Sequence, residues 1–366
     1  MVYTVAFESV PPMIPAIIKQ FSITDVQAGL LMSIVIVPGL FLSLPSGWLL
    51  NKYQAKKVGV AALVCLAVAS IVTAISNSFE LMLFGRLILG LGGILITITG
   101  LTIISQWFGD KDLGKAMGLM GASVPIAVLI TFPSMSLVTA NFGWRYPFYI
   151  SSFLAATAVV VFLVAIKDGP YCHDKGVKGE RKDYVNLELW KLGLFCLCAQ
   201  GAGFSFSTWA PTLFTEFVHI ANVQASFLAG LSGLFTIFLV PFFGYLSDRV
   251  GKRRLFLILG PLLMTVAFVS LALVTNVTMI GSVLFVGVAT AIFIPVLNAM
   301  PPEILGHGKA GIGFGVINVC GSLGAILSVP FIGFLISATG SYAVSLFGIG
   351  AFSVAAVVLA LTLKTR

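Results

Sequence analysis

The sequence predicts an all-α membrane protein in which 12 transmembrane helices form two parallel, pseudo-symmetric halves of six helices each. Three observations support this prediction. Of the 366 residues, 58% are hydrophobic and only 9% are charged, whereas soluble domains have about 25% charged residues. Apolar runs long enough to cross a bilayer recur from end to end, and the positive charges alternate between successive loops.

This composition excludes a soluble enzyme and a nucleic-acid-binding protein, because so few charges could not cover the surface of a soluble chain. The excess of 21 Lys and Arg over 13 Asp and Glu is therefore first an indicator of topology. No CxxC pair, ligand cluster or phosphate-binding glycine loop occurs. We expect no metal and no cofactor, although a proton or another coupling ion is possible.

The first half, residues 1–167, is predicted to be a six-helix bundle. Pro11, Pro12 and Pro15 should bend or break its first span. The corresponding span of the second half begins about eight residues earlier, so we expect the first helix to be truncated. The predicted spans of this half are 2–18, 26–50, 58–76, 79–106, 114–138 and 146–166.

The second half, residues 190–366, has six further apolar runs. Its tenth span contains Pro295, Pro301 and Pro302, which should bend or break that helix. Broken helices at a repeat interface commonly line substrate paths in transporters. The predicted spans are 190–214, 224–247, 255–274, 277–301, 310–337 and 342–363.

The distribution of Lys and Arg orients the helices. If the N-terminus is cytoplasmic, 18 of the 21 cations lie at the C-terminus or beside the loops that follow even-numbered spans. By the positive-inside rule, both termini and the polar linker 168–189 are then cytoplasmic. The sequence therefore predicts a multi-pass protein of the plasma membrane, whose direct surroundings are the lipid bilayer.

The two halves are related by duplication. They align at a fixed offset of 197 residues, at which Val26-Gln27-Ala28 matches Val223-Gln224-Ala225 and Gly90 matches Gly287. Because each half crosses the membrane an even number of times, the repeats have the same orientation.

Two related motifs follow the second and eighth spans. The second copy has the pattern G-x-L-x-D-R-x-G-K-R, and its residues are Gly244, Asp248, Arg249, Gly251, Lys252 and Arg253. The first copy is degraded: it keeps Gly47 and Lys52, but Asn51 replaces the acid. Such loops can lock the cytoplasmic ends of two helices together, or their cations can serve only as topology anchors.

Together with Arg86-x-x-x-Gly90-x-Gly92 in the fourth span, these loops resemble the signatures of the major facilitator superfamily. The resemblance covers essentially the whole chain. It implies a secondary transporter, not an enzyme, whose halves move in alternating access around a cavity. The antiporter pattern of the family's fifth span is absent, because Gly118, Gly121 and Pro125 have a different spacing.

The predicted function is transport of a small organic solute or organic anion, by proton symport or down its gradient. The main alternative is efflux of an amphipathic compound, and a less favoured one is an integral-membrane receptor or enzyme. We expect a small-molecule substrate as the partner, no nucleic acid, and a monomer.

Two charged residues lie well inside predicted spans, Glu8 in the first and Arg86 in the fourth. Charges within a membrane are costly and commonly functional. At 1.5 Å per residue, the two lie about one helical turn apart in depth, so we predict that they pair. The pair is either a static structural contact or a switch that a proton or the substrate operates.

The remaining candidates come from residue type and depth. Possible substrate contacts, each of which alone is more typical of packing, are Tyr3, Gln200, Ser205, Ser207, Trp209, Asn298 and Asn318. Small residues let helices approach closely in lipid, so glycines should mark helix crossings. The predicted packing glycines are Gly90, Gly92, Gly118, Gly121 and Gly315.

Overall fold

The computed structural model describes the backbone of residues 1–52, 54–107, 110–166, 186–216, 218–273, 278–305 and 310–363. Within these ranges, the side chains of residues 43–52, 105–106, 110–118, 278–279, 302 and 310–312 are outside the description. The described residues form helices joined by short turns, without a strand.

The first of two compact units comprises Met1–Ile23 and Leu30–Lys175. The first predicted span is a broken helix in this unit, as its three prolines predict. Its helices are α1 (Val2–Glu8), η1 (Pro11–Met13), α2 (Ile14–Phe21), α3 (Asp25–Lys52), α4 (Ala55–Ala74), α5 (Phe79–Trp107), α6 (Asp110–Phe142) and α7 (Tyr146–Ala165), of which α3 begins in the other unit.

The second unit comprises Thr24–Gly29 and Gly176–Arg366. Its helices are α9 (Leu187–Glu216), α10 (Asn222–Val250), α11 (Arg253–Leu273), α12 (Thr278–Leu305), α13 (Ala310–Thr339) and α14 (Tyr342–Thr362). The start of α3 is tied to α13 in this unit, because the Ser337 hydroxyl donates to Asp25 at 2.8 Å. The predicted linker 168–189 lies mostly outside the described residues, so its boundaries stay predictions.

Eleven helices of the described part, α3 to α7 and α9 to α14, are long and apolar enough to cross a membrane. With the broken first span, they match the predicted spans in order. The expected break of the tenth span is wrong, because α12 runs uninterrupted from Thr278 to Leu305 despite its prolines. A proline removes one main-chain hydrogen bond, and neighbouring groups commonly compensate for it in membrane helices.

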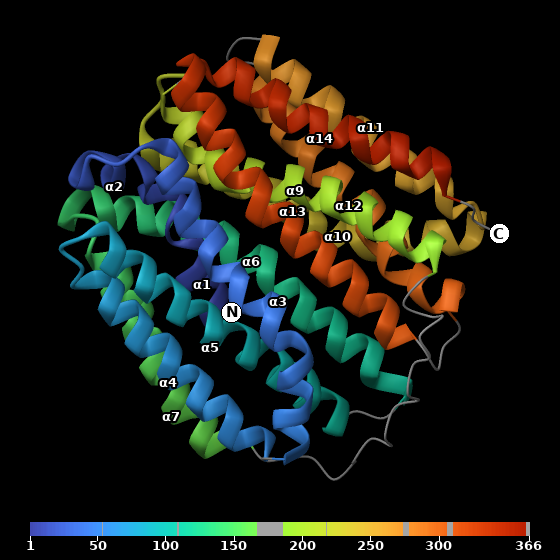
Figure 1. Ribbon diagram of the computed structural model, residues 1–366, viewed down its shortest axis with the longest axis horizontal. Coiled ribbons are helices and arrows are strands. Elements are labelled where there is room, and N and C mark those ends of the chain that lie inside the picture. Colours follow the sequence, from blue (N-terminus) through green and yellow to red (C-terminus); the bar gives the residue numbers. More distant parts are fainter. Residues whose placement is uncertain are drawn as a thin grey trace. The chain divides into compact units, whose positions relative to one another are not determined.

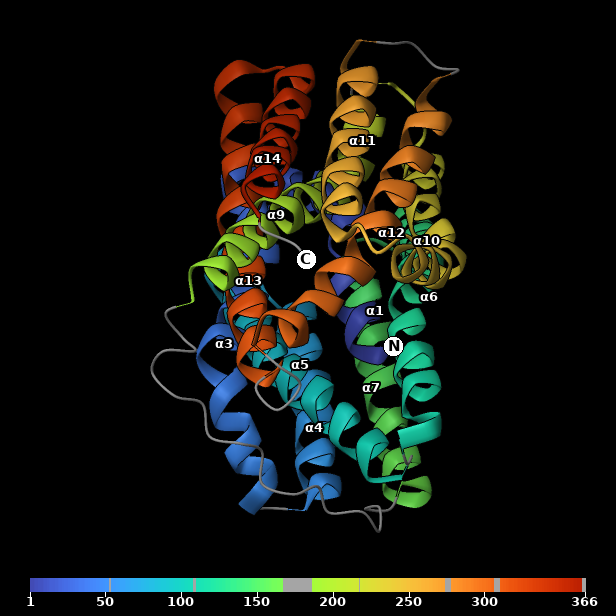
Figure 2. The ribbon, with the colours of Figure 1, turned by 90° about the vertical axis from the view of Figure 1, so that its right-hand side faces the viewer.

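The packing of the helices repeats between the units. In the first unit α4 packs against α5 and α7, which can be followed in Figure 1. In the second unit α11 packs against α12 and α14, the equivalent helices, as Figure 2 shows. The offset of 197 residues relates the start of α3 at Asp25 to the start of α10 at Asn222. The helix boundaries therefore agree with the duplication read from the sequence.

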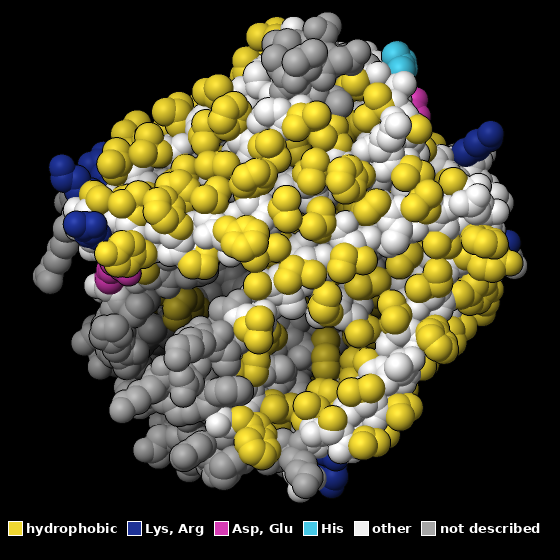
Figure 3. Space-filling model, turned by 180° about the vertical axis from the view of Figure 1, so that it is seen from behind, with side chains coloured by type: hydrophobic (Ala, Val, Ile, Leu, Met, Phe, Trp, Pro, Cys, Tyr) yellow, Lys and Arg dark blue, Asp and Glu magenta, His cyan; other side chains and the backbone are white. Residues whose placement is uncertain are grey.

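Large apolar side chains cover much of the helix surface. Phe41, Phe153 and Phe238 are each more than 70% exposed. Figure 3 shows the same preponderance of hydrophobic side chains, with few Lys, Arg, Asp and Glu among them. Such a surface is stable only against lipid or another apolar surface.

Candidate functional site

A buried arginine at the break of the first span is the centre of the candidate site. Helix α1 ends at Glu8, and the 3₁₀ turn Pro11–Met13 separates it from α2. Arg86 projects from α5 to this break and is only 1% exposed.

The guanidinium of Arg86 is held by main-chain carbonyls. Nη1 donates to the carbonyl of Ala6 at 2.9 Å, and Nη2 donates to that of Phe7 at 3.0 Å. Nε donates to the carbonyl of Leu31 in α3 at 3.0 Å. The ring of Phe7 also lies 5.7 Å from the guanidinium carbon, within the range of a cation–π contact. Arg86 thus joins α1, α3 and α5.

Glu8 does not form the direct ion pair with Arg86 that the sequence analysis predicts. Within the described residues, no carboxylate oxygen lies within 4 Å of the guanidinium, and Oε2 of Glu8 has no hydrogen-bond partner. The prediction compared only the depths of the two residues and did not consider the carbonyls that a break in the first span leaves free. The prolines end α1 at Glu8, so its last carbonyls are free to take the guanidinium instead.

The second half has neutral residues at the matching positions. At the offset of 197, Glu8 corresponds to Ser205 and Arg86 corresponds to Val283. Both of these residues are fully buried. The repeated fold therefore forms without charges at these positions, which makes Glu8 and Arg86 candidates for a function in addition to packing.

Three of the predicted substrate contacts are used in helix packing. Ser205 donates to Ser328, which donates in turn to the carbonyl of Gly201, so α9 and α13 are joined. The indole of Trp209 donates to the carbonyl of Val329 at 3.1 Å. The ring of Tyr3 fills the space above Gly93 of α5, where a Cβ atom would lie 2.1 Å from it.

The other four predicted contacts remain available for a ligand. Gln200 and Ser207 are half-buried on α9, whereas Asn298 on α12 and Asn318 on α13 are exposed. Among the described residues, none of the four side chains has a hydrogen-bond partner. These four polar side chains lie in the middle of apolar helices and have no hydrogen-bond partner among the described residues.

The second loop motif ties three helices together. Arg253 at the start of α11 forms ion pairs with Asp248 of α10 at 2.7 Å and with Glu303 of α12 at 2.8 Å. Its guanidinium also donates to the Ser247 hydroxyl at 3.0 Å. Gly251 ends α10 with a φ of 69°, which a glycine adopts at little cost. Arg249 and Lys252 are exposed beside it.

Sequence reasoning missed Glu303, although the duplication contains a signal for it. At the offset of 197, Glu303 corresponds to Gln106, and Asp248 corresponds to Asn51. The two acids that pair with Arg253 are thus replaced by amide side chains at the equivalent positions of the first half. The side chains of Gly47, Asn51 and Lys52 in the first loop motif lie outside the described part of the chain.

The predicted packing glycines divide into two groups. A Cβ atom on Gly90 would lie 2.2 Å from a main-chain oxygen of α3, and one on Gly92 would lie 2.9 Å from a main-chain oxygen of α4. A Cβ atom on Gly121 or Gly315 would meet nothing within 4 Å, so close packing is not found there. The surroundings of Gly118 are outside the description.

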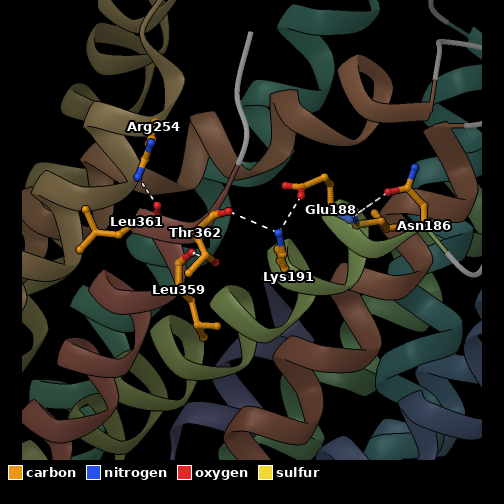
Figure 4. Close-up of polar contacts among 8 residues, drawn as sticks. Asn186, Glu188, Lys191, Arg254, Leu359, Leu361 and Thr362 are labelled. Carbon is orange, nitrogen blue, oxygen red and sulfur yellow. Dashed lines mark hydrogen bonds and ion pairs between the residues drawn. The ribbon is translucent and has the colours of Figure 1, made fainter.

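Two cations hold the end of α14, another contact that the sequence analysis missed. Lys191 of α9 donates to the carbonyl of Thr362 at 3.4 Å and pairs with Glu188 at 2.7 Å. Arg254 of α11 donates to the carbonyl of Leu361, and both side chains point to this last turn in Figure 4. Cations at a helix C-terminus interact favourably with its carbonyls and dipole. They fix α14 to α9 and α11.

No group of three or more His, Cys, Asp and Glu residues suited to a metal ion occurs in the described part of the chain. The described residues form an apolar bundle of duplicated helices in which Arg86 is the one buried Lys or Arg. This arrangement is typical of a membrane transporter.

Comparison with known proteins agrees with this class. A family model described as Major Facilitator Superfamily matches residues 1–221 and 192–366. The chain therefore belongs to the major facilitator superfamily, and it is a multi-pass membrane transporter rather than an enzyme.

The relatives found by sequence carry the names of anion transporters. A "Probable nitrate transporter" of Staphylococcus epidermidis is 23% identical, over 99% of this chain and 93% of the relative. A "Nitrite extrusion protein" of Bacillus subtilis is 24% identical, over 91% of this chain and 84% of the relative. A "Probable sulfoacetate transporter" of Cupriavidus necator is 22% identical, over 93% of this chain and 86% of the relative.

A solved structure shows the same fold. It is a bacterial homologue of the human lysosomal transporter Spinster in an inward-facing and occupied conformation. The match has a TM-score of 0.81 with 15% identity, and it covers 98% of this chain and 93% of that one.

Proposed function

We propose that this protein is a secondary transporter that moves a small anion together with a proton by alternating access. The observation that carries the proposal is Arg86, a cation that is 1% exposed and held by neutral carbonyls. A buried charge is costly unless it is compensated. An anionic substrate would supply that compensation.

The shape of the guanidinium supports an oxyanion as the substrate. Arginine presents a planar fork of N–H donors that matches two oxygens of one anion. The names of the relatives refer to nitrate, nitrite and sulfoacetate, which are all oxyanions.

Glu8 is the proposed proton carrier. It is 7% exposed, and its Oε2 has no hydrogen-bond donor, so a charge on this carboxyl group is poorly compensated. A proton on Glu8 removes that charge next to Phe7, whose carbonyl already binds Arg86. The site then has a net positive charge and attracts an anion. Loss of the proton favours release of the anion.

The helix break favours a proton over Na⁺ as the coupling ion. Unwound main-chain carbonyls at broken helices commonly coordinate Na⁺ in transporters. Here the carbonyls of Ala6 and Phe7 bind the cationic Arg86, which would repel a metal cation.

Gln200, Ser207, Asn298 and Asn318 are the proposed polar contacts of the substrate on the second unit. Among the described residues their side chains have no hydrogen-bond partner, in contrast to Ser205 and Trp209 of α9. Amides and hydroxyls can donate to the oxygens of an anion without adding charge.

Uptake into proteoliposomes tests the proposal. An inward proton gradient should drive accumulation of nitrate, nitrite or sulfoacetate, and the variant Glu8→Gln should lose this drive while it still exchanges anion across the membrane. Glu8→Asp keeps a carboxyl group and is the matched control. Accumulation by Glu8→Gln against the anion gradient, with pH as the only driving force, would show that Glu8 does not couple the proton.

Export is the second candidate, because one relative is named a nitrite extrusion protein. The same vesicles distinguish the directions: when they are loaded with nitrite and given an inward proton gradient, an exporter that exchanges nitrite for protons empties them faster than protein-free vesicles, whereas a symporter retains the nitrite.

A further inference from the structure

One of the carbonyls that bind Arg86, that of Phe7, lacks its helical donor because of the proline sequence. In an α-helix the carbonyl of residue i accepts from the N–H of residue i+4. The donor for Phe7 would be residue 11 and the donor for Glu8 would be residue 12, and both are prolines without an N–H.

Arg86 supplies the missing donor from another helix. Its Nη2 donates to Phe7 at 3.0 Å, where the N–H of residue 11 would otherwise donate. Its Nη1 donates to Ala6 at 2.9 Å, and the Ser9 hydroxyl shares this carbonyl at 3.0 Å. The end of α1 therefore occupies both terminal nitrogens of the guanidinium.

An oxyanion that binds arginine through two oxygens needs the same part of the guanidinium. Bidentate recognition uses two parallel N–H groups, commonly those of Nη1 and Nη2. Nε is held at the same time by Leu31 of α3 at 3.0 Å, so the edge shared with Nε is less available. Nη2 also donates to the sulfur of Met32 at 3.5 Å, so of the five N–H groups only one, on Nη1, has no acceptor among the described residues. An anion that binds through two oxygens must therefore displace at least one of these acceptors.

We propose that the carbonyls of Ala6 and Phe7 are an internal competitor for the anion on Arg86, and that Pro11 maintains this competitor at Phe7. The inference rests on the proposed function and names the regulation of its site. Anion binding displaces the end of α1 from Arg86, which links occupancy of the site to movement of α1 relative to α5. Pro11 is a positioning residue, because it acts through the Phe7 carbonyl that it leaves free.

This linkage explains how binding of the substrate could shift the protein between the two conformations of alternating access. A ligand shifts a conformational equilibrium only through different affinities for the two states. Here one state has α1 bound to Arg86, and the other has the anion in its place. The affinity for the anion is lowered by the free energy of the contacts that it replaces.

The variant P11A/P12A tests the competition. It restores N–H donors to the carbonyls of Phe7 and Glu8, so the Phe7 carbonyl no longer needs Arg86. The nitrate concentration that half-maximally raises the melting temperature should fall roughly tenfold, the effect of one ordinary hydrogen bond. The control is P15A: Pro15 lies in the first turn of α2, where its N–H is not needed. P15A should bind nitrate like the unchanged protein.

A measurement without ligand tests the structural basis. Arg86→Gln should lower the melting temperature of the otherwise unchanged protein more than that of P11A/P12A, since the Phe7 carbonyl of P11A/P12A has its own donor and loses nothing when Arg86 is removed. Equal decreases in both backgrounds would overturn the inference, whatever the substrate is. The inference would also be overturned if nitrate, nitrite or sulfoacetate bound to the unchanged protein and P11A/P12A bound the same anion no more tightly. Failure of all three anions to bind either protein would instead refute the proposed function, and the competition with it.

Discussion

Gly90 packs so closely against Val35 that a Cβ atom on the glycine would lie 2.2 Å from the carbonyl oxygen of Val35. The same relationship recurs 197 residues later, where a Cβ atom on Gly287 would lie 2.2 Å from the carbonyl oxygen of Ser232. The second and fourth spans of each half therefore cross at equivalent points. Duplication has preserved this contact while most side chains around it differ.

Replacing either glycine by alanine should destabilise the protein. In Gly90→Ala and Gly287→Ala the new methyl group meets main chain, which cannot turn aside as a side chain can. Overpacking of this kind costs about 1–3 kcal/mol, so the melting temperature in detergent should fall by several degrees.

Gly121→Ala and Gly315→Ala are the matched controls. Both glycines lie inside helices where a Cβ atom would meet nothing within 4 Å, and alanine is the better helix former. Their melting temperatures should be unchanged or higher. If the melting temperature of these controls fell as much as that of Gly90→Ala, the close helix crossing would not be what makes Gly90 and Gly287 sensitive to substitution.

Arg86→Lys should destabilise the protein although it keeps the positive charge. A lysine ammonium is a compact donor and cannot reach the carbonyls of Ala6, Phe7 and Leu31 at once. Each buried carbonyl left without a donor costs about 1–3 kcal/mol. Abundance and melting temperature should both decrease, and anion uptake should be lost.

Arg145→Lys is the control for this prediction. Arg145 also donates to a main-chain carbonyl, that of Ser76 at 3.2 Å, but at a less buried position. Arg145 also donates to the side chain of Asn77 at 2.7 Å and lies 4.9 Å from the ring of Trp144, so the substitution should cost about 0.5–1.5 kcal/mol, less than Arg86→Lys. Equal melting temperatures for the two lysine variants would contradict the assigned role of Arg86.

Asp248→Asn combined with Glu303→Gln should slow transport several-fold with little change in substrate affinity. The two substitutions leave Arg253 without its acids and reproduce the amides Asn51 and Gln106 of the first half. Since Asp248 is 67% and Glu303 is 49% exposed, each pair contributes only about 0.2–1 kcal/mol. The initial rate of uptake is measured at several substrate concentrations.

Ionic strength gives an independent check of this loop. Salt screens exposed ion pairs, so the unchanged protein should slow at high salt while the double variant responds less. Unchanged flux in the variant, with normal expression, would show that Asp248 and Arg253 are only topology anchors.

Cys172 should be inaccessible from outside intact cells. It lies in the linker that the positive-inside rule assigns to the cytoplasm. A membrane-impermeant maleimide should therefore label Cys172 only after permeabilisation, whereas Asn141→Cys, near an outer loop, should react at once. Rapid labelling of Cys172 in intact cells would reverse the orientation.

Much of the fold could be predicted because hydropathy and duplication are both properties of the sequence. The apolar runs place the helices, and Pro11 and Pro12 predict the break in the first span. The break that Pro295, Pro301 and Pro302 predict in the tenth span does not occur, since neighbouring helices can compensate for lost main-chain bonds, and the alternative, a bend, stays a prediction.

The contacts of single side chains were less predictable. The helical rise per residue predicts that Glu8 and Arg86 lie at similar depths in the membrane. It cannot show that free main-chain carbonyls accept the hydrogen bonds of the guanidinium. Ser205 and Trp209 have the residue types of a binding site, yet their partners Ser328 and Val329 lie on α13, more than a hundred residues away. Only the packing of α9 on α13 reveals that these polar groups are already satisfied.

The bond between Arg86 and α1 also has a consequence for synthesis of the chain. The carbonyl of Ala6 and its donor are 80 residues apart, and ribosomes add about 5–20 residues per second. For roughly 4–16 seconds, the nascent first span has three prolines, an acidic side chain and unbonded carbonyls, and it lacks the arginine that binds it. Such a segment is a poor substrate for independent insertion, so we expect the translocon or a membrane chaperone to retain it until α5 emerges. The proposed substrate site is thus also the point at which the first and fourth spans assemble.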